Sequence, residues 1–88
     1  MTYHVVLNSV AQKQFRRLDR QVQQQLKPHI QSLCHGLNHR CVKLKGYDDR
    51  YRLRSGSYRI VFEMHDGQLI VLLLSIAHRK DIYRVLGS

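Results

Sequence analysis

The chain has 88 residues, of which 15 are Lys or Arg and 6 are Asp or Glu, so its formal net charge at pH 7 is +9. This length predicts one domain over residues 1–88, and the excess of positive charge favours a polyanionic partner: nucleic acid, an acidic protein or an anionic membrane surface. The sequence has no run of about 18 apolar residues and no basic segment at its start, which excludes a membrane-spanning helix and a signal peptide. We therefore expect a cytoplasmic protein.

The first part of the chain predicts a strand followed by a helix. Residues 3–7 are mostly β-branched or aromatic, as is typical of a short strand. Either Asn8 or Ser9 is suited to the N-cap of a helix. From Val10 to Leu18 the apolar residues recur at helical spacing, so we expect an amphipathic helix there.

The next segment predicts a second helix that folds back on the first. Asp19 is suited to its N-cap, and an apolar row follows at positions 22, 26, 30 and 33. Pro28 lies inside this row and removes a backbone hydrogen bond, but the row continues in phase, which favours a kink over a break. Gly36 is suited to the end of the helix.

Residues 35–49 are polar and basic, and only Val42 and Leu44 alternate as apolar positions. Gly46 and the pair Asp48-Asp49 predict turns. The element order that we expect therefore has no strand in this segment.

Arginine and apolar residues alternate over residues 50–54, which predicts a strand. The alternation places Tyr51 and Leu53 on one face of the sheet. The other face then receives three guanidinium groups, from Arg50, Arg52 and Arg54. Guanidinium groups on one face of a sheet form a surface suited to phosphate.

Two more strands follow. A turn at residues 55–57 leads into a strand over residues 58–65, and Asp66-Gly67 predicts a two-residue hairpin turn. Residues 69–77 are almost continuously apolar, which predicts an interior strand covered on both faces, one of them by the helix hairpin. The expected fold is α+β with the order β-α-α-β-β-β: an antiparallel-dominated sheet, a helix hairpin on one side and a short C-terminal tail.

Four arginines and one tyrosine are expected to converge at one end of this sheet, because an antiparallel meander brings the end of its last strand beside the arginine hairpin. They are Arg52, Arg54, Arg59, Arg79 and Tyr83. Such a set could cleave RNA without a metal or cofactor. The ribose 2′-OH would attack the adjacent phosphate, leaving a 2′,3′-cyclic phosphate and a free 5′-OH, while the arginines neutralise the charge that develops.

Proton transfer requires a base and an acid in addition to these cations. Tyr83, among several guanidinium groups, is the expected base. The acid is left open, because arginine does not release its proton in proteins. His78 carries an imidazole that could transfer a proton, but it serves equally well as a structural hydrogen-bonding residue.

Further residues around the patch are expected to contact RNA. Tyr47 is the best-placed aromatic side chain for stacking on a splayed base. The full set is Lys43, Lys45, Tyr47, Arg50, His78, Lys80 and Arg84. The scattered carboxylates do not suggest a metal site, and the two cysteines predict ordinary thiols of a reducing compartment rather than zinc ligands.

Three segments resemble the RelE group of the RelE/ParE toxin superfamily: residues 44–46 (LKG), 51–62 (YRLRSGSYRIVF) and 76–84 (IAHRKDIYR). Element order and length extend the likeness over nearly the whole chain. The resemblance implies a RelE-like fold and a toxin of a type II toxin–antitoxin pair, which enters the ribosomal A site and cuts the mRNA there, so inhibiting translation. It also implies two partners, the A site with its mRNA and rRNA, and a cognate antitoxin whose acidic segment wraps the toxin.

The resemblance also implies roles for individual residues. Arg52 and Arg54 would lie near the scissile phosphate, with Arg59 opening the next strand. Arg79 and Tyr83 would serve phosphate stabilisation and proton transfer or base stacking. Well-studied members carry lysine at the first two positions, so the arginines here are assigned only to phosphate binding and charge neutralisation. Arg79 or a water-mediated donor is then the acid that the family suggests.

Two other functions stay open. A ParE-like toxin has the same fold but inhibits DNA gyrase, and it needs no RNA-cleaving residues. A non-catalytic basic module would only bind its antitoxin. The arginine and tyrosine set favours the enzyme, a metal-independent endoribonuclease of the mRNA interferase type.

Overall fold

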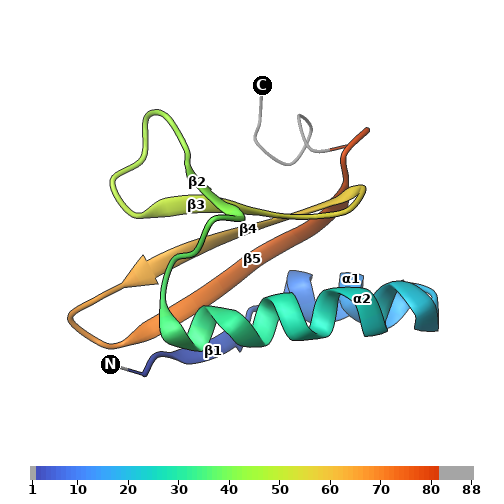
Figure 1. The fold of residues 1–88 in the computed structure, drawn as a ribbon, viewed down its shortest axis with the longest axis horizontal. Coiled ribbons are helices and arrows are strands. Elements are labelled where there is room, and N and C mark those ends of the chain that lie inside the picture. Colours follow the sequence, from blue (N-terminus) through green and yellow to red (C-terminus); the bar gives the residue numbers. More distant parts are fainter. Residues whose placement is uncertain (1, 82–88) are drawn as a thin grey trace.

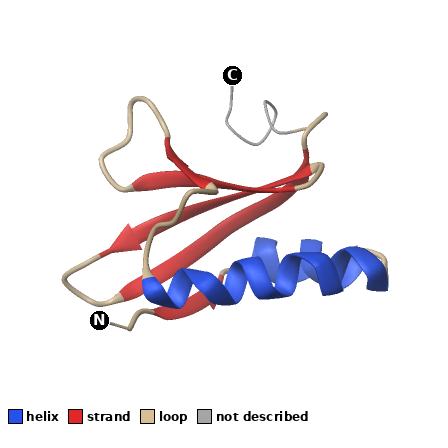
Figure 2. Cartoon of the chain, viewed as in Figure 1, coloured by secondary structure: helices blue, strands red, loops and turns tan. Residues whose placement is uncertain are grey.

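The computed structural model describes residues 2–81. Figure 1 shows a curved sheet with two helices packed against one of its faces, and Figure 2 separates the same elements by type. In chain order they are β1 (His4–Leu7), α1 (Ser9–Arg17), α2 (Arg20–Gln31), a 3-10 turn η1 (Ser32–His35), β2 (Cys41–Lys43), β3 (Arg50–Ser55), β4 (Tyr58–His65) and β5 (Ile70–His78).

The strands lie in the order β1-β5-β4-β3-β2. The β5–β4, β4–β3 and β3–β2 pairs are antiparallel, whereas β1 pairs with β5 in parallel. The predicted α+β fold, with an antiparallel-dominated sheet and a helix hairpin on one side, is confirmed.

The core lies between the helices and the sheet. Its fully buried side chains come from both layers: Ala11, Leu26 and Leu33 on the helical side, and Leu53, Ile60, Phe62, Val71 and Leu73 on the sheet. Removing this apolar surface from water is the main force that holds the two layers together. No helix within residues 2–81 has the length and apolar character needed to cross a membrane.

The helix ends follow the sequence signals in part: α1 is capped as predicted, but α2 ends at Gln31 and not at Gly36, because the last turn before Gly36 tightens into η1. The Asn8 side chain accepts a hydrogen bond from the Ala11 amide at 2.8 Å, whereas Asp19 holds the N-cap position of α2 without a side-chain capping bond. α2 continues through Pro28 to Gln31, so the chain does not break there. Gly36, with φ of 96°, ends η1 in the left-handed region that favours glycine.

β2 is a strand that the sequence analysis did not predict. It has three residues and pairs with β3, placing Val42 opposite Arg52. Val42 is 52% exposed at this edge of the sheet. So short a strand takes its conformation from backbone pairing with β3 and not from a buried face, and hydrophobic periodicity therefore carries no signal for it.

The turn between β4 and β5 is longer than predicted. His65 pairs with Ile70, so the loop between the strands consists of residues 66–69. The prediction of a two-residue turn at Asp66-Gly67 is therefore wrong. The amides of Gln68 and Leu69 donate to carbonyls three residues earlier, and Leu69 takes a positive φ of 55°. A left-handed residue at the end of the loop restores the direction of the strand.

β5 is an interior strand, as its apolar sequence predicts, because it lies between β1 and β4. The prediction that both faces of β5 are covered is wrong for the described residues. Val71 and Leu73 are buried against the helices, but Leu72 and Leu74 are only half-buried. The sheet therefore has one covered face and one partly open face, and the arginines of β3 lie on the latter.

Candidate active site

The turn between β3 and β4 brings two arginines directly opposite each other. Arg54 of β3 pairs with Arg59 of β4, and Ser55 pairs with Tyr58 to close the turn. Paired residues in adjacent strands point to the same face. Arg52, two residues before Arg54, shares that face, which is the one turned away from the helices.

The end of β5 adds Arg79 to this group. Ala77 pairs with Arg59, and the backbone amide of Arg79 donates to the Ser57 carbonyl at 2.6 Å. In Figure 1 the red end of the described chain accordingly lies beside the β3–β4 turn. The structure thus brings together the four predicted arginines, Arg52, Arg54, Arg59 and Arg79, which we call the arginine cluster.

The electrostatics of Arg59 report how close these charges are. Its pKa is lowered, first by burial and then by the charges of the three other arginines of the cluster. Its Nη1 atom donates to the Gly56 carbonyl at 2.8 Å and to the Tyr58 carbonyl at 3.0 Å, which fixes the guanidinium group beside the turn. Like charges held together in this way favour a bound anion.

Over the described residues, the arginine cluster has no carboxylate partner. Within residues 2–81, none of its four guanidinium groups forms an ion pair. The Nε atom of Arg52 is buried and has no hydrogen-bond acceptor in the part of the chain that the structure describes. Buried donors are usually satisfied, so this Nε atom is an exception, and its burial also keeps it out of contact with an incoming phosphate.

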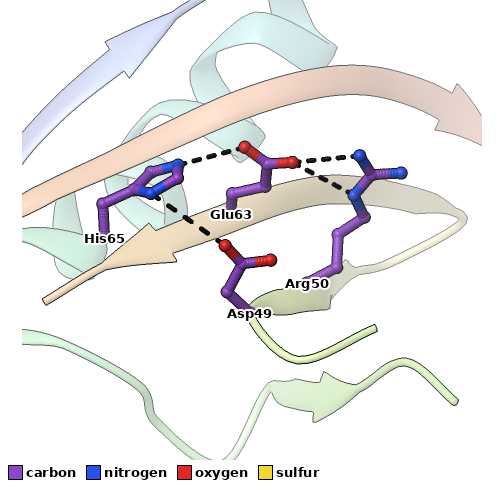
Figure 3. Close-up of polar contacts among 4 residues, drawn as sticks. All are labelled: Asp49, Arg50, Glu63 and His65. Atoms are coloured by element: carbon purple, nitrogen blue, oxygen red, sulfur yellow. Dashed lines mark hydrogen bonds and ion pairs between the residues drawn. The ribbon is translucent and has the colours of Figure 1, made fainter. Parts of the chain in front are cut away.

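Arg50 lies in a different environment, although it follows the same face of β3. Its Nε and Nη2 atoms donate to one Glu63 carboxylate oxygen at 3.2 and 3.0 Å, and its guanidinium carbon lies 4.5 Å from the centre of the Tyr47 ring. Figure 3 shows Arg50 and Glu63 with two further residues: Glu63 also contacts His65 at 3.0 Å, and His65 approaches Asp49 at 4.0 Å. The charge of Arg50 is therefore largely neutralised within the protein.

The other predicted RNA contacts are distributed around the sheet. Lys43 lies on β2 opposite Tyr51, Lys45 and Tyr47 lie in the exposed loop before β3, and Lys80 is exposed beyond β5. Lys43 shares the face of its partner Tyr51, which is opposite the arginine cluster. Lys45 and Tyr47 precede the end of β3 that is distant from the β3–β4 turn, while Lys80 directly follows Arg79.

His78 lies on the helix side of the sheet. It pairs with Tyr58, and the two rings meet edge to face with their centres 5.4 Å apart. Its Nδ1 atom accepts a hydrogen bond from the Lys80 amide at 3.2 Å. Successive residues of a strand point to opposite faces, so His78, which pairs with Tyr58, lies on the face opposite Arg59 and the arginine cluster. These contacts agree with the predicted structural role of His78 and not with its role as an acid.

Tyr83 and Arg84 lie outside the described residues. The predicted roles of Tyr83 as a base and of Arg84 as an RNA contact therefore stay predictions.

The sequence analysis missed Arg40. The Arg54 amide donates to the Arg40 carbonyl at 3.0 Å, and Arg40 Nη1 reaches the Arg54 carbonyl at 3.5 Å. The pKa of His29 on α2 is lowered by burial and then by the charge of Arg40, so the Arg40 guanidinium group lies toward α2 and not in the arginine cluster. Arg40 follows a polar segment without periodicity, and only the pairing of β2 with β3 would have revealed it.

Comparison with known proteins identifies the family of this chain. Residues 5–83 match the family described as the ParE toxin of the type II toxin–antitoxin system parDE. The sequence is 30% identical, over 82 residues, to the mRNA interferase toxin RelE of Escherichia coli strain K12, covering 91% of this chain and 86% of that protein.

Solved structures share the fold. The RelE chain of the intact E. coli RelBE toxin–antitoxin complex matches with a TM-score of 0.75 and 29% identity, over 86% of this chain and 95% of that chain. A chain of the archaeal RelE–RelB complex from Pyrococcus horikoshii OT3 matches with a TM-score of 0.77 and 24% identity, over 90% and 97% of the two chains.

Fold and sequence together define a small toxin of a type II toxin–antitoxin system. The chain belongs to the RelE/ParE toxin superfamily, and its similarity to RelE proteins places it with the RelE-type toxins. The family resemblance that the sequence suggested is confirmed.

Proposed function

We propose that this toxin is a ribosome-dependent endoribonuclease that cleaves mRNA in the A site. The observation that carries the proposal is the arginine cluster, whose four cations converge on one face of the sheet without a carboxylate partner in the described chain. A scissile phosphate supplies the negative charge that this cluster lacks. The mRNA interferase name of a relative that is 30% identical supports the same activity.

The reaction needs little from the protein beyond positioning and charge. The ribose 2′-oxygen bonds to phosphorus, the bond to the 5′-oxygen breaks, and the products are a 2′,3′-cyclic phosphate and a 5′-hydroxyl. The intermediate phosphorane carries more negative charge than the ground state, so fixed guanidinium groups stabilise the transition state more than the substrate.

The arginines do not transfer the protons, because they stay charged in proteins. We assign the base to Tyr83, as the family resemblance implies. Since His78 faces the helices, a water-mediated donor at the arginine cluster is the acid that we propose.

The arginine cluster also suits the second partner. We propose that a cognate antitoxin neutralises this toxin with an acidic segment, as a RelB protein accompanies RelE in the E. coli complex. The net charge of +9 favours association with such a segment and with ribosomal RNA alike. Both partners are cytoplasmic, which is where we expect the toxin to act.

The test is primer extension on an mRNA that is being translated in a purified system with added toxin. We expect cuts within the A-site codon, and we expect Arg59→Ala and Arg79→Ala to lower the cleavage rate by about 100-fold each, since each removes a charge aimed at the phosphorane. Lys13→Ala, on α1, is the control and keeps the full rate. Absence of A-site cuts with the wild-type toxin would contradict the proposal.

Inhibition of DNA gyrase is the second function to test, because the matching family is described as the ParE toxin. A supercoiling assay with purified gyrase distinguishes the two. Gyrase inhibition that survives Arg59→Ala, with no mRNA cleavage by the wild type, would favour this function over the endoribonuclease.

A further inference from the structure

A buried polar cluster lies under the β3–β4 turn, on the side of the sheet opposite the arginine cluster. Ser55 is fully buried there. Its Oγ atom lies 2.6 Å from His29 Nδ1, and Gln25 Nε2 donates to the Ser55 carbonyl at 3.1 Å and approaches its Oγ at 3.4 Å. His29 and Gln25 both belong to α2, so one helix holds the turn through a side chain and a backbone group.

A side chain at position 56 would displace the Gln25 amide of α2 from the turn. Gly56 has φ of +57°, and a Cβ atom built on it would lie 2.6 Å from Gln25 Nε2. The Gly56 carbonyl in turn accepts a hydrogen bond from the Arg59 guanidinium group at 2.8 Å. Helix, turn and guanidinium group are therefore connected by consecutive contacts.

The three turn residues each secure a different element. Ser55 is bound to α2, the Gly56 carbonyl holds Arg59, and the Ser57 carbonyl holds the Arg79 amide at 2.6 Å. A shift of the turn would therefore move at least two of the cations in the arginine cluster. Displacements of about 1 Å at a reacting centre lower rates by about 100-fold.

We propose that His29 and Gln25 are positioning residues for RNA cleavage, which act through Ser55 and Gly56 to orient Arg59. They touch neither the substrate nor the reacting atoms. The inference rests on the proposed endoribonuclease function, and it extends the functional unit from the arginine cluster to the helix on the far side of the sheet.

The test compares variants in single-turnover cleavage of ribosome-bound mRNA with the full-length toxin in excess. His29→Leu removes the hydrogen-bonding nitrogen and is expected to slow cleavage about tenfold, while the affinity for the ribosome stays within about twofold, since the phosphate-binding charges remain. His29→Asn places an amide oxygen near the Nδ1 position and should restore most of the rate. Gln25→Ala is expected to slow cleavage in the same way.

Three controls separate positioning from a loss of stability. Ile30→Val, the next residue of α2, destabilises the core without touching Ser55 and should keep the wild-type rate. His39→Ala removes an exposed imidazole nearby and should also be neutral. In the background of Arg59→Ala, His29→Leu should slow cleavage clearly less than the about tenfold expected in the wild type, because Arg59 is already absent and the turn then positions only Arg79.

The outcomes divide cleanly. If the wild type cleaves and His29→Leu and Gln25→Ala match it, the inference is overturned and the proposed function stands. The inference is also overturned if Ile30→Val slows cleavage as much as His29→Leu at equal loss of melting temperature, or if the defects of His29→Leu and Arg59→Ala multiply. If the wild type does not cleave, the proposed function itself has failed.

Discussion

Glu63 binds Arg50 and His65 at the end of β3 that is distant from the β3–β4 turn. Its carboxylate receives Arg50 on one oxygen and His65 on the other. Burial opposes the ionisation of Glu63, but the hydrogen bonds and charges of Arg50 and His65 outweigh it, so its pKa is lowered. The pair also holds Arg50 against the Tyr47 ring, which gives order to the loop before β3.

A lowered pKa in the folded state makes stability depend on pH. The unfolded chain binds a proton to this carboxyl more readily, so the contribution is present above the unfolded pKa of about 4.3 and is lost as the pH falls through the folded pKa. Glu63→Gln should cost about 1 kcal/mol at pH 7 and flatten the acid limb of the stability curve. Urea unfolding at a series of pH values measures both effects.

Asp48→Asn provides the control for this prediction, because Asp48 is exposed in the loop before β3. Its curve should follow the wild type at each pH. Curves for wild type and Glu63→Gln that stay parallel from neutral to acid pH would show that the Glu63 contacts do not persist in solution.

At the scale of an element, the β3–β4 turn combines two requirements at one glycine. Gly56 needs a positive φ, and it also needs room for the Gln25 side chain. Gly46 shares only the first requirement, since its φ is +85° and a Cβ atom there would meet nothing within 4 Å. Gly67 has open space and no positive φ.

These three glycines allow a matched series of alanine substitutions. Gly67→Ala should be nearly neutral, and Gly46→Ala should cost about 1 kcal/mol for the left-handed backbone. Gly56→Ala should cost more than Gly46→Ala, because Gln25 must also move. Thermal unfolding ranks the three, and equal losses at positions 46 and 56 would argue against close docking of the turn on α2.

Cleavage provides a second measurement for the same series. Only Gly56→Ala should slow it, since only that turn carries the arginine cluster.

At the scale of the whole molecule, the residues that make up the net charge of +9 should contribute unequally to RNA binding. Arg54 lies in the arginine cluster, which forms no ion pair within residues 2–81, whereas Arg50 forms an ion pair with Glu63. Counterion release makes RNA affinity fall with salt in proportion to the number of phosphates neutralised. The two arginines, four residues apart on one strand, should therefore contribute differently.

We expect Arg54→Ala to reduce the slope of log affinity against log salt by about 0.7 for single-stranded RNA, and Arg50→Ala to change it much less. Fluorescence anisotropy with a short RNA at several salt concentrations measures the slopes. Equal reductions for both substitutions would mean that Arg50 leaves Glu63 and contacts phosphate.

Much of this fold follows from local sequence signals, as particular residues show. Asn8 caps α1, the alternation over residues 50–54 sets the two faces of β3, and the arginines at positions 54 and 59 meet across a short turn. The convergence of Arg79 also followed from sequence, because an antiparallel meander fixes where β5 ends.

Features that depend on pairing between distant segments could not be predicted. β2 exists through its bonds to β3, Arg40 is placed by those bonds, and the role of Gln25 depends on the docking of α2 under the turn. The side of the sheet to which His78 points is set by its pairing with Tyr58. In each case the position depends on a contact with a residue that is distant in the sequence, and hydrophobic periodicity does not reveal such contacts.

The parallel pairing of β1 with β5 sets the order in which this toxin is completed during synthesis. The neighbour of β1 in the sheet is residues 70–73, which are translated after most of the chain. Arg79 follows directly after the same strand. Pairing β1 with β5 closes a loop of most of the chain, which is slow compared with local folding. β1 therefore stays unpaired while residues 8–69 are synthesised. The sheet edge and the last cation of the site thus form together, and no shorter nascent chain carries the complete arginine cluster.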